Sequence, residues 1–191
     1  MSVALSHDVV AAGGTDRNIR VWNRETGRVV RTLAGHSGKV YGLSFPSFST
    51  SSSSSAASAS TTASSSTLLS CSTDRSICVW DLRSGKCVRA IRTPSVVNAV
   101  AASGDGVLAA SAHQDGTIRL FDLRTGKKVA EAHKLHSAPA SSVAFSVGDG
   151  SARLLTAGRD SVIHQLSAKT LTPAHAHSFS HPALHIPFAW S

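Results

Sequence analysis

The chain has 191 residues, of which 41% are hydrophobic, and a formal net charge of +8. This composition supports a packed core and excludes a chain that is disordered throughout. No apolar stretch is long enough to cross a bilayer as a helix, and the N-terminus lacks the pattern of a secretory signal.

Two further features of the composition narrow the partners and the compartment. The basic residues are dispersed along the chain, which favours an ordinary soluble surface over a specific nucleic-acid site. The three cysteines are odd in number and form no Cys-x-x-Cys pair. We therefore interpret them as buried thiols and expect a cytoplasmic protein.

A repeat organises the whole chain. Four segments align without gaps, and each has an Asp followed six positions later by a large apolar residue. These pairs are Asp16/Trp22, Asp74/Trp80, Asp115/Phe121 and Asp160/Leu166. Apart from the first interval, the Asp residues are about 40–45 positions apart, which is the period of a four-stranded propeller blade. We therefore expect units at about 1–34, 35–91, 92–134 and 135–179, with the start of a fifth at 180–191.

The elements recur in the same order in each unit. A strand precedes the Asp turn, at 8–14, 67–72, 107–112 and 153–158. A second strand follows the Asp, with aliphatic residues three and five positions after it: Ile19/Val21, Ile77/Val79 and Ile118/Leu120. A tight turn with Gly and an outer strand come next, at 28–33, 86–91 and 127–132. This period-two alternation predicts an all-β chain without helices.

The first interval is longer because residues 47–66 are almost wholly Ser, Thr and Ala. This tract has no hydrophobic period of any kind. We predict that it is a disordered loop inserted into the second unit.

Gly-His at 35–36 and Trp-Asp at 80–81 show which family the repeat resembles. The pattern is similar to that of the WD-repeat family, whose members are β-propellers that usually close with seven blades. The resemblance implies a WD-repeat β-propeller. Because the chain holds about four units, we expect an incomplete ring, either a fragment of a seven-bladed propeller or a chain that a partner completes.

The resemblance also implies a role for the repeated Asp. In WD repeats it accepts hydrogen bonds from a His of the preceding loop, a Ser or Thr of the second strand and the Trp. The second unit has the full set: His36, Ser70 or Ser72 (with Ser72 assigned to the network), Asp74 and Trp80. The fourth unit has His136, a candidate in Thr156, and Asp160, but Leu166 cannot donate. Asp16, Trp22 and Asp115 are the members expected in the other units. In the third unit Thr93 stands where the His is expected. We expect all four turn Asp residues to be largely buried.

A closer resemblance covers much of the chain. Stretches that carry it are 32–40, 80–88, 118–129, 154–160 and 178–191. They are similar to the C-terminal propeller of the autophagy-related protein 16 family. The resemblance implies a non-catalytic protein-interaction scaffold that directs the lipid conjugation of a ubiquitin-like protein to membranes. Such a scaffold is cytoplasmic and reaches membranes through its partners.

An alternative function rests on a short motif. Residues 80–83 and 121–124 read Trp/Phe-Asp-Leu-Arg, and in other WD proteins this pattern docks the adaptor of a cullin-based ubiquitin ligase. Arg83 and Arg124 would then be the contacts of a substrate receptor. Arg is also common at this turn, and a four-letter motif has low specificity.

The remaining candidates concern binding and catalysis. Lys39, with Arg92 and Lys134, flanks the predicted inter-blade loops, so we expect protein partners that are acidic, or peripheral contact with an anionic membrane. The sequence shows no catalytic motif, no cofactor site and no small-molecule substrate site. His175, His177, His181 and His185 have no Cys or carboxylate nearby, so no metal site is predicted.

Overall fold

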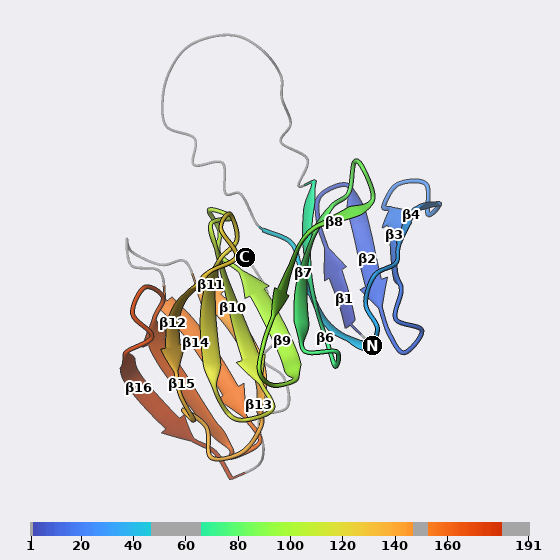
Figure 1. Cartoon of the computed structure of the whole chain (residues 1–191). Helices are drawn as coiled ribbons and strands as arrows, with labels where there is room; N and C mark the ends of the chain where they lie inside the picture. Colours follow the sequence, from blue (N-terminus) through green and yellow to red (C-terminus); the bar gives the residue numbers. More distant parts are fainter. Residues whose placement is uncertain (1, 47–65, 147–152, 181–191) are drawn as a thin grey trace, which may run out of the picture.

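The computed structural model describes residues 2–46, 66–146 and 153–180. Within these ranges it contains sixteen strands and no helix, hence no helix that could cross a membrane (Figure 1). Apart from Ser66 and Ser180, the predicted loop at 47–66 and the predicted fifth unit at 180–191 lie outside the described residues. The strands are β1 (Ser2–Leu5), β2 (Val9–Gly13), β3 (Ile19–Asn23), β4 (Val29–Leu33), β5 (Val40–Ser44), β6 (Thr67–Ser72), β7 (Ser76–Asp81), β8 (Lys86–Arg92), β9 (Val97–Ala102), β10 (Leu108–His113), β11 (Ile118–Asp122), β12 (Lys128–Ala132), β13 (Ala140–Ser146), β14 (Arg153–Gly158), β15 (Val162–Ser167) and β16 (Pro173–Ser178).

The described strands form four antiparallel sheets, each with four strands in chain order: β1–β4, β5–β8, β9–β12 and β13–β16. The all-β class and the four-stranded blades predicted from the repeat are confirmed. In every sheet the register between the third and fourth strands shifts at the same place, directly before the residue six positions after the Asp. This shared bulge places one extra residue on each outer strand and increases its twist.

Neighbouring sheets pack face to face through apolar side chains. Ile19 and Val21 of the first sheet lie in one cluster with Leu68 and Trp80 of the second. The corresponding faces of the second and third sheets, and of the third and fourth, form two further clusters. The aliphatic residues that were predicted to alternate after each Asp are all buried: Ile19, Val21, Ile77, Val79, Ile118 and Leu120. The core therefore lies between the sheets.

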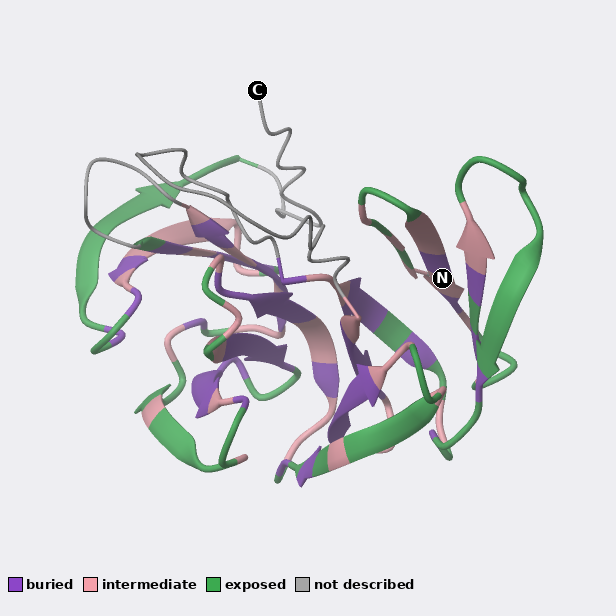
Figure 2. Ribbon diagram, turned by 90° about the horizontal axis from the view of Figure 1, so that it is seen from above, coloured by how far each residue is buried: buried purple, intermediate pink, exposed green. Residues whose placement is uncertain are grey.

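The four sheets follow one another around an arc (Figure 2). Their first strands lie side by side, since β1 contacts β5, β5 contacts β9, and β9 contacts β13. The last strand of each sheet lies at the periphery and is mostly exposed. Figure 2 shows these outer strands in green on the outside of the arc.

Because successive strands run in opposite directions, their connections gather on two rims of the arc. We call one the Asp-turn rim. It holds the turns between the second and third strands of each sheet and the connections from one sheet to the next. We call the other the hairpin rim, and it holds the turns between the third and fourth strands. The turns between the first and second strands lie on the hairpin rim as well.

The cysteines correct one expectation. Cys71 and Cys78 are buried as predicted, but Cys87 is exposed. Cys87 lies on the outer strand β8, whose side chains have no neighbouring strand to cover them.

Candidate functional site: polar turn networks and the rims they hold

The second sheet contains a continuous chain of hydrogen bonds. Trp80 Nε1 donates to Ser70 Oγ over 2.7 Å, and Ser70 Oγ donates to His36 Nε2 over 2.7 Å. His36 Nδ1 then donates to Asp74 Oδ2 over 2.9 Å. Each donor meets one acceptor only if the imidazole is neutral and carries its proton on Nδ1. The chain joins the inter-sheet loop, β6, β7 and the Asp turn, and so holds the Asp-turn rim in place.

Asp74 is the charged end of this chain. Burial alone would raise its pKa, but hydrogen bonds from Ser76, His36 and the Ser37 backbone outweigh burial and hold the pKa at about 2. Ser37 N donates to Asp74 Oδ2 over 2.9 Å, so the carboxylate also fixes the loop that enters the second sheet. Asp74 is therefore ionised and joins the loop to the turn.

The structure corrects the assignment of Ser72. Its hydroxyl accepts a hydrogen bond from Asp74 N over 3.2 Å, within the turn. Ser70, two positions earlier, occupies the place between His36 and Trp80. Since side chains two positions apart share one face of a strand, sequence spacing could not distinguish the two serines.

The fourth sheet repeats the network without its Trp. His136 Nδ1 lies 3.0 Å from Asp160 Oδ1, and His136 Nε2 lies 3.0 Å from Thr156 Oγ1. Ser137 N donates to Asp160 Oδ2 over 3.0 Å, as Ser37 does to Asp74. Leu166 stands in the Trp position and is fully buried, so packing replaces the indole hydrogen bond there.

The third sheet has a different network, which sequence reasoning missed. The ring of His113, on β10, lies within hydrogen-bond distance of Ser111 Oγ at 2.8 Å and of Ser95 Oγ at 3.2 Å. The buried Arg119 donates to Asp115 Oδ2 over 3.0 Å and to Glu131 Oε1 over 2.9 Å. His113 of strand β10 thus takes the place of the loop His that the second and fourth sheets use. Arg119, four positions after Asp115, takes the place of that His as the donor to the carboxylate. The sequence carries only a partial signal: Arg follows the Asp four positions later in this unit, but also in the first, as Arg20 after Asp16.

Electrostatics in the third sheet follow from these contacts. Burial, and then the nearby charge of Arg119, lowers the pKa of His113 to about 4. Burial would raise the pKa of Asp115, but the hydrogen bonds from Arg119 and from the Thr117 backbone hold it at about 2. The network therefore consists of a neutral imidazole beside a buried Arg119 that pairs with two partly exposed carboxylates.

The first sheet has no such network, contrary to expectation. Asp16 pairs with Arg20 over 2.6 Å, and its side chain is 41% exposed, compared with 8% for Asp74. Ala12 occupies the hydroxyl position, and Trp22 is only partly buried. No hydrogen bond joins Asp16 to Trp22 among the described residues. Asp115 is also 34% exposed, so the prediction that all four turn Asp residues are largely buried is wrong for two of them.

The Asp-turn rim carries exposed cations that have no acidic partner. None of them forms an ion pair with another described residue, and they are Arg17, Lys39, Arg75, Arg92, Lys134 and Arg159. Backbone bonds place them together: Thr73 N donates to Lys39 O, and Thr93 N donates to Arg75 O. The acids on this rim, Asp16, Asp74, Asp115 and Asp160, are all bound to a His or an Arg. The six unpaired cations outnumber these four carboxylates, two of which are already neutralised by an Arg, so the net charge of this rim is positive.

Arg83 and Arg124 lie on the opposite rim from Lys39. Each follows an Asp whose carboxylate accepts backbone hydrogen bonds and closes the turn. Asp81 Oδ1 accepts from Arg83 N over 3.0 Å, and Asp122 Oδ1 accepts from Arg124 N over 2.7 Å. Both Arg side chains are exposed. The hairpin rim also holds Asp8, Glu25, Asp81, Asp105 and Asp122, so it is less one-sided in charge than the Asp-turn rim.

The late histidines do not come together with other metal ligands in the described part of the chain. His175 and His177 lie on the exposed strand β16, while His181 and His185 lie outside the described residues. No group of three or more His, Cys, Asp or Glu in residues 2–46, 66–146 and 153–180 could hold a metal ion.

Comparison with known proteins agrees with the repeat and the sheets. A family model described as "WD domain, G-beta repeat" matches residues 27–81 and 85–122. The matched segments include β4–β7 and most of the third sheet. They therefore include the complete His36–Asp74 network, whereas Arg83 and Arg124 lie just outside the matched residues.

Several curated relatives are similar over most of the chain. Autophagy-related protein 16 of Arabidopsis thaliana is 35% identical over 90% of this chain, and Protein tipD of Dictyostelium discoideum is 31% identical over 89%. The U5 small nuclear ribonucleoprotein 40 kDa protein of Dictyostelium discoideum is 33% identical over 81%. The chain spans 30%, 25% and 39% of these relatives, respectively. Identity at this level is thus shared with proteins named for different processes.

Proposed function

The chain belongs to the WD40-repeat family, and from this premise we propose that it is a non-catalytic protein-interaction scaffold. More specifically, we propose that it is the propeller part of an autophagy-related protein 16-like factor that directs the lipid conjugation of a ubiquitin-like protein to membranes. The 35% identity to a relative of that name over 90% of the chain supports this assignment. Its place of action would be the cytoplasm, with membranes reached through its partners.

The positive Asp-turn rim is the observation that carries the proposal. Its six exposed cations form no ion pair with the acids of that rim, because each of those acids is bound to a His or to another Arg. Such a surface attracts acidic segments of partner proteins and can touch an anionic membrane at its periphery. The hydrogen-bonded sheets behind it hold the backbone of these residues in place, which limits the loss of backbone entropy on binding.

A gene-replacement experiment in the source organism tests the proposal. Arg17, Arg75 and Arg159 are changed to Glu together, and the matched control changes Arg24, Arg124 and Lys127, all on the hairpin rim, to Glu. After starvation, the lipid-linked form of the ubiquitin-like protein is measured by its gel mobility and its membrane fraction. We expect the first variant to lower the membrane-bound form and the control to leave it unchanged. If deletion of the whole gene leaves lipid conjugation and its location unchanged, the autophagy role is wrong.

A second candidate is a substrate receptor of a cullin-based ubiquitin ligase. The observation that favours it is the position of Arg83 and Arg124, both exposed on one rim with their backbone N–H groups bound in the turn. Co-purification of the ligase adaptor, lost on Arg83→Ala, would support this candidate. Absence of the adaptor from preparations of the intact protein would reject it.

A further inference from the structure

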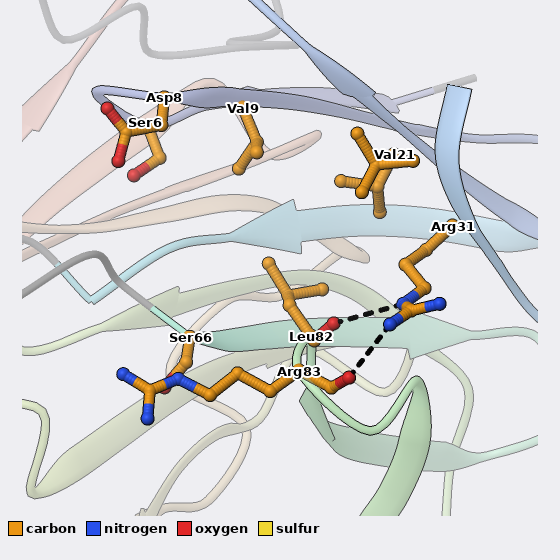
Figure 3. A pocket seen from close by; sticks show the side chains of 9 residues that line it. Ser6, Asp8, Val9, Val21, Arg31, Ser66, Leu82 and Arg83 are labelled. Carbon is orange, nitrogen blue, oxygen red and sulfur yellow. Dashed lines mark hydrogen bonds between the residues drawn. The ribbon is translucent and has the colours of Figure 1, made fainter. Parts of the chain in front are cut away.

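A small cavity lies between the first and second sheets on the hairpin rim, away from the cations discussed above. Its volume is about 170 Å³. Figure 3 shows Val9 and Val21 of the first sheet above Leu82, which follows β7 in the second sheet. Asp8 and Arg83 lie at one end, on the first and second sheets respectively. The cavity thus has apolar walls and an opening with one charge on each side.

The wall formed by Leu82 and Arg83 is held by the first sheet. Arg31, on β4, donates to Arg83 O over 3.0 Å and to Leu82 O over 3.4 Å. These bonds use the guanidinium of Arg31 and the carbonyls of the turn, as the dashed lines of Figure 3 show. The cavity is therefore formed before any ligand enters, which lowers the cost of binding.

This cavity is not a general result of packing one sheet on the next. At the second junction Arg89 donates a hydrogen bond to Thr125 O over 3.1 Å, much as Arg31 donates to the turn at the first junction. The residue equivalent to Leu82 is nevertheless buried there, as Leu123, and buried again at the third junction, as Ala168. Leu82 is only partly buried. This position is thus less covered at the first junction than at its two counterparts.

The size of the cavity restricts what can occupy it. Sites for small molecules usually enclose about 300–1,000 Å³, so this one is too small for a cofactor or a metabolite of ordinary size. It suits one large apolar side chain, and single buried anchors of this kind carry much of the energy in protein interfaces. The occupant is therefore a side chain of a protein segment.

The charge at the opening indicates which kind of residue stands next to the apolar anchor in the partner segment. The side chain of Arg83 is exposed and forms no hydrogen bond or ion pair with another described residue, whereas two nitrogens of Arg31 already donate to the turn. A free guanidinium beside an apolar cavity favours a carboxylate next to the anchor. We propose that this cavity binds a short segment of a partner protein with a large apolar residue, Leu or an aromatic, adjacent to an acidic residue that pairs with Arg83. This site is independent of the proposed use of the Asp-turn rim.

A labelled peptide, Gly-Ser-Glu-Leu-Glu-Ser-Gly, with a Trp version of the same design, serves as the probe, and fluorescence anisotropy measures its binding to the intact protein. Replacing the central residue by Ala should weaken binding at least about tenfold, as should replacing both acids by Gln. Arg83→Glu should have a similar effect, and Val9→Phe should fill the cavity and abolish binding.

Arg124→Glu is the matched control, because Arg124 is the equivalent exposed residue at the second junction, where Leu123 is buried. It should leave the affinity unchanged. Equal loss with Arg124→Glu would show that only net charge matters and would overturn the proposal. So would peptides that bind no better with Leu or Trp than with Ala. Failure of the proposed scaffold function is separate, since it would appear in the lipid-conjugation experiment with the triple Arg17, Arg75 and Arg159 variant and not in this peptide titration.

Discussion

In the second sheet, the hydroxyl oxygen of Ser70 joins Trp80 to His36. This oxygen accepts from Trp80 and its proton goes to His36, so both partners are buried and both lose a bond if it is removed. Ser72 has a single partner, the backbone N of Asp74. The two serines therefore make a matched pair, although their spacing in the sequence looks equivalent.

We expect Ser70→Ala to destabilise the protein by about 1–3 kcal/mol, because it leaves a buried indole N–H and an imidazole nitrogen unpaired. Ser72→Ala should cost less, about 1 kcal/mol or below. Urea unfolding followed by Trp fluorescence measures both values. Equal losses in the two variants would contradict the network described for the second sheet.

His113 gives the protein a stability that depends on pH. Its pKa in the folded protein is about 4, below the ordinary value of 6.5. Between these values the unfolded chain binds a proton that the folded protein does not, so lowering the pH favours unfolding. The free energy of unfolding is therefore not reduced by His113 above pH 6.5, and it decreases as the pH falls from 6.5 toward 4.

The expected loss across that window is roughly 3 kcal/mol. Urea denaturation at a series of pH values should show it in the wild type, and His113→Gln should flatten the curve between pH 6.5 and 4. Burial also lowers the pKa of His164, so a smaller slope remains in the variant. Asp74 and Asp115 act in a lower window, near pH 4 to 2, where their stabilising charge is lost. An unchanged slope in His113→Gln would refute this role.

Among single residues, the sequence could predict those that stand at positions repeated in every unit. His36, Asp74 and Trp80 stand where the repeat requires them, and the structure brings them together around Ser70. The third sheet could not be predicted in this way because its imidazole comes from the strand. Asp16 is exposed because Ala12 removes the hydroxyl that a network would need, a consequence visible only once the strands are paired.

At the scale of elements, the Asp turn of the third sheet depends on Gly116. Its φ is +77°, and a Cβ there would lie 2.1 Å from the carbonyl oxygen of His136. Gly116 O also accepts a bond from His136 N over 3.0 Å, so this turn is pressed directly against the loop that enters the fourth sheet. Backbone on both sides of the contact leaves no flexible side chain to move away.

Gly116→Ala should therefore destabilise the protein by at least about 2 kcal/mol, through backbone strain and a clash with the loop. Gly14→Ala is the control, because a Cβ at Gly14 would meet nothing within 4 Å. Thermal unfolding compares the two. A fall in melting temperature no larger for Gly116→Ala than for the control would show that the two elements are not in such close contact.

The elements themselves were largely predictable. Period-two alternation identified the strands on either side of each Asp, because one face of every sheet packs on a neighbour. The bulge between the third and fourth strands was not predictable, since nothing in the outer sequences "RVVRTL" or "KCVRAI" marks Val30 or Val88 as the extra residue. Both side chains are exposed, so packing leaves no trace in the pattern.

At the scale of the whole molecule, the first sheet exposes an apolar face that the other sheets cover. Val3 is 58% exposed, whereas its equivalents Leu43, Val100 and Val143 are 8%, 6% and 6% exposed. Leu5 is also 61% exposed. In the second, third and fourth sheets the preceding sheet packs on these positions. An exposed apolar patch of this kind promotes association.

We expect the protein to associate with itself as its concentration rises, and the double variant Val3→Asp, Leu5→Asp to reduce this association. Light scattering over a concentration series measures it. Val88→Asp is the control, since Val88 is equally exposed but stands alone on an outer strand. Association that the control reduces as strongly as the double variant would rule out the first sheet's face as its cause.

The repeat register was enough to predict four blades in order, because each Asp turn and each inter-blade loop recurs together. The binding rim was harder to predict from the sequence, where basic residues are scattered singly. The structure shows which rim each charged residue lies on. On the Asp-turn rim every acid is bound to a His or an Arg, whereas the acids of the hairpin rim lie among its Lys and Arg residues.

The central claim, that the Asp-turn rim binds acidic partners, is tested most directly by the salt dependence of one binding reaction. A labelled poly-glutamate peptide is titrated with the intact protein at ionic strengths from about 0.05 to 0.3 M, where screening shortens the reach of charge. Vesicles containing phosphatidylserine form a second arm that tests contact with a membrane. We predict that affinity falls steadily with salt, and that changing Arg17, Arg75 and Arg159 to Glu together removes binding while Arg124→Glu preserves it. Binding that is indifferent to salt, or that is lost equally in both variants, would contradict the account.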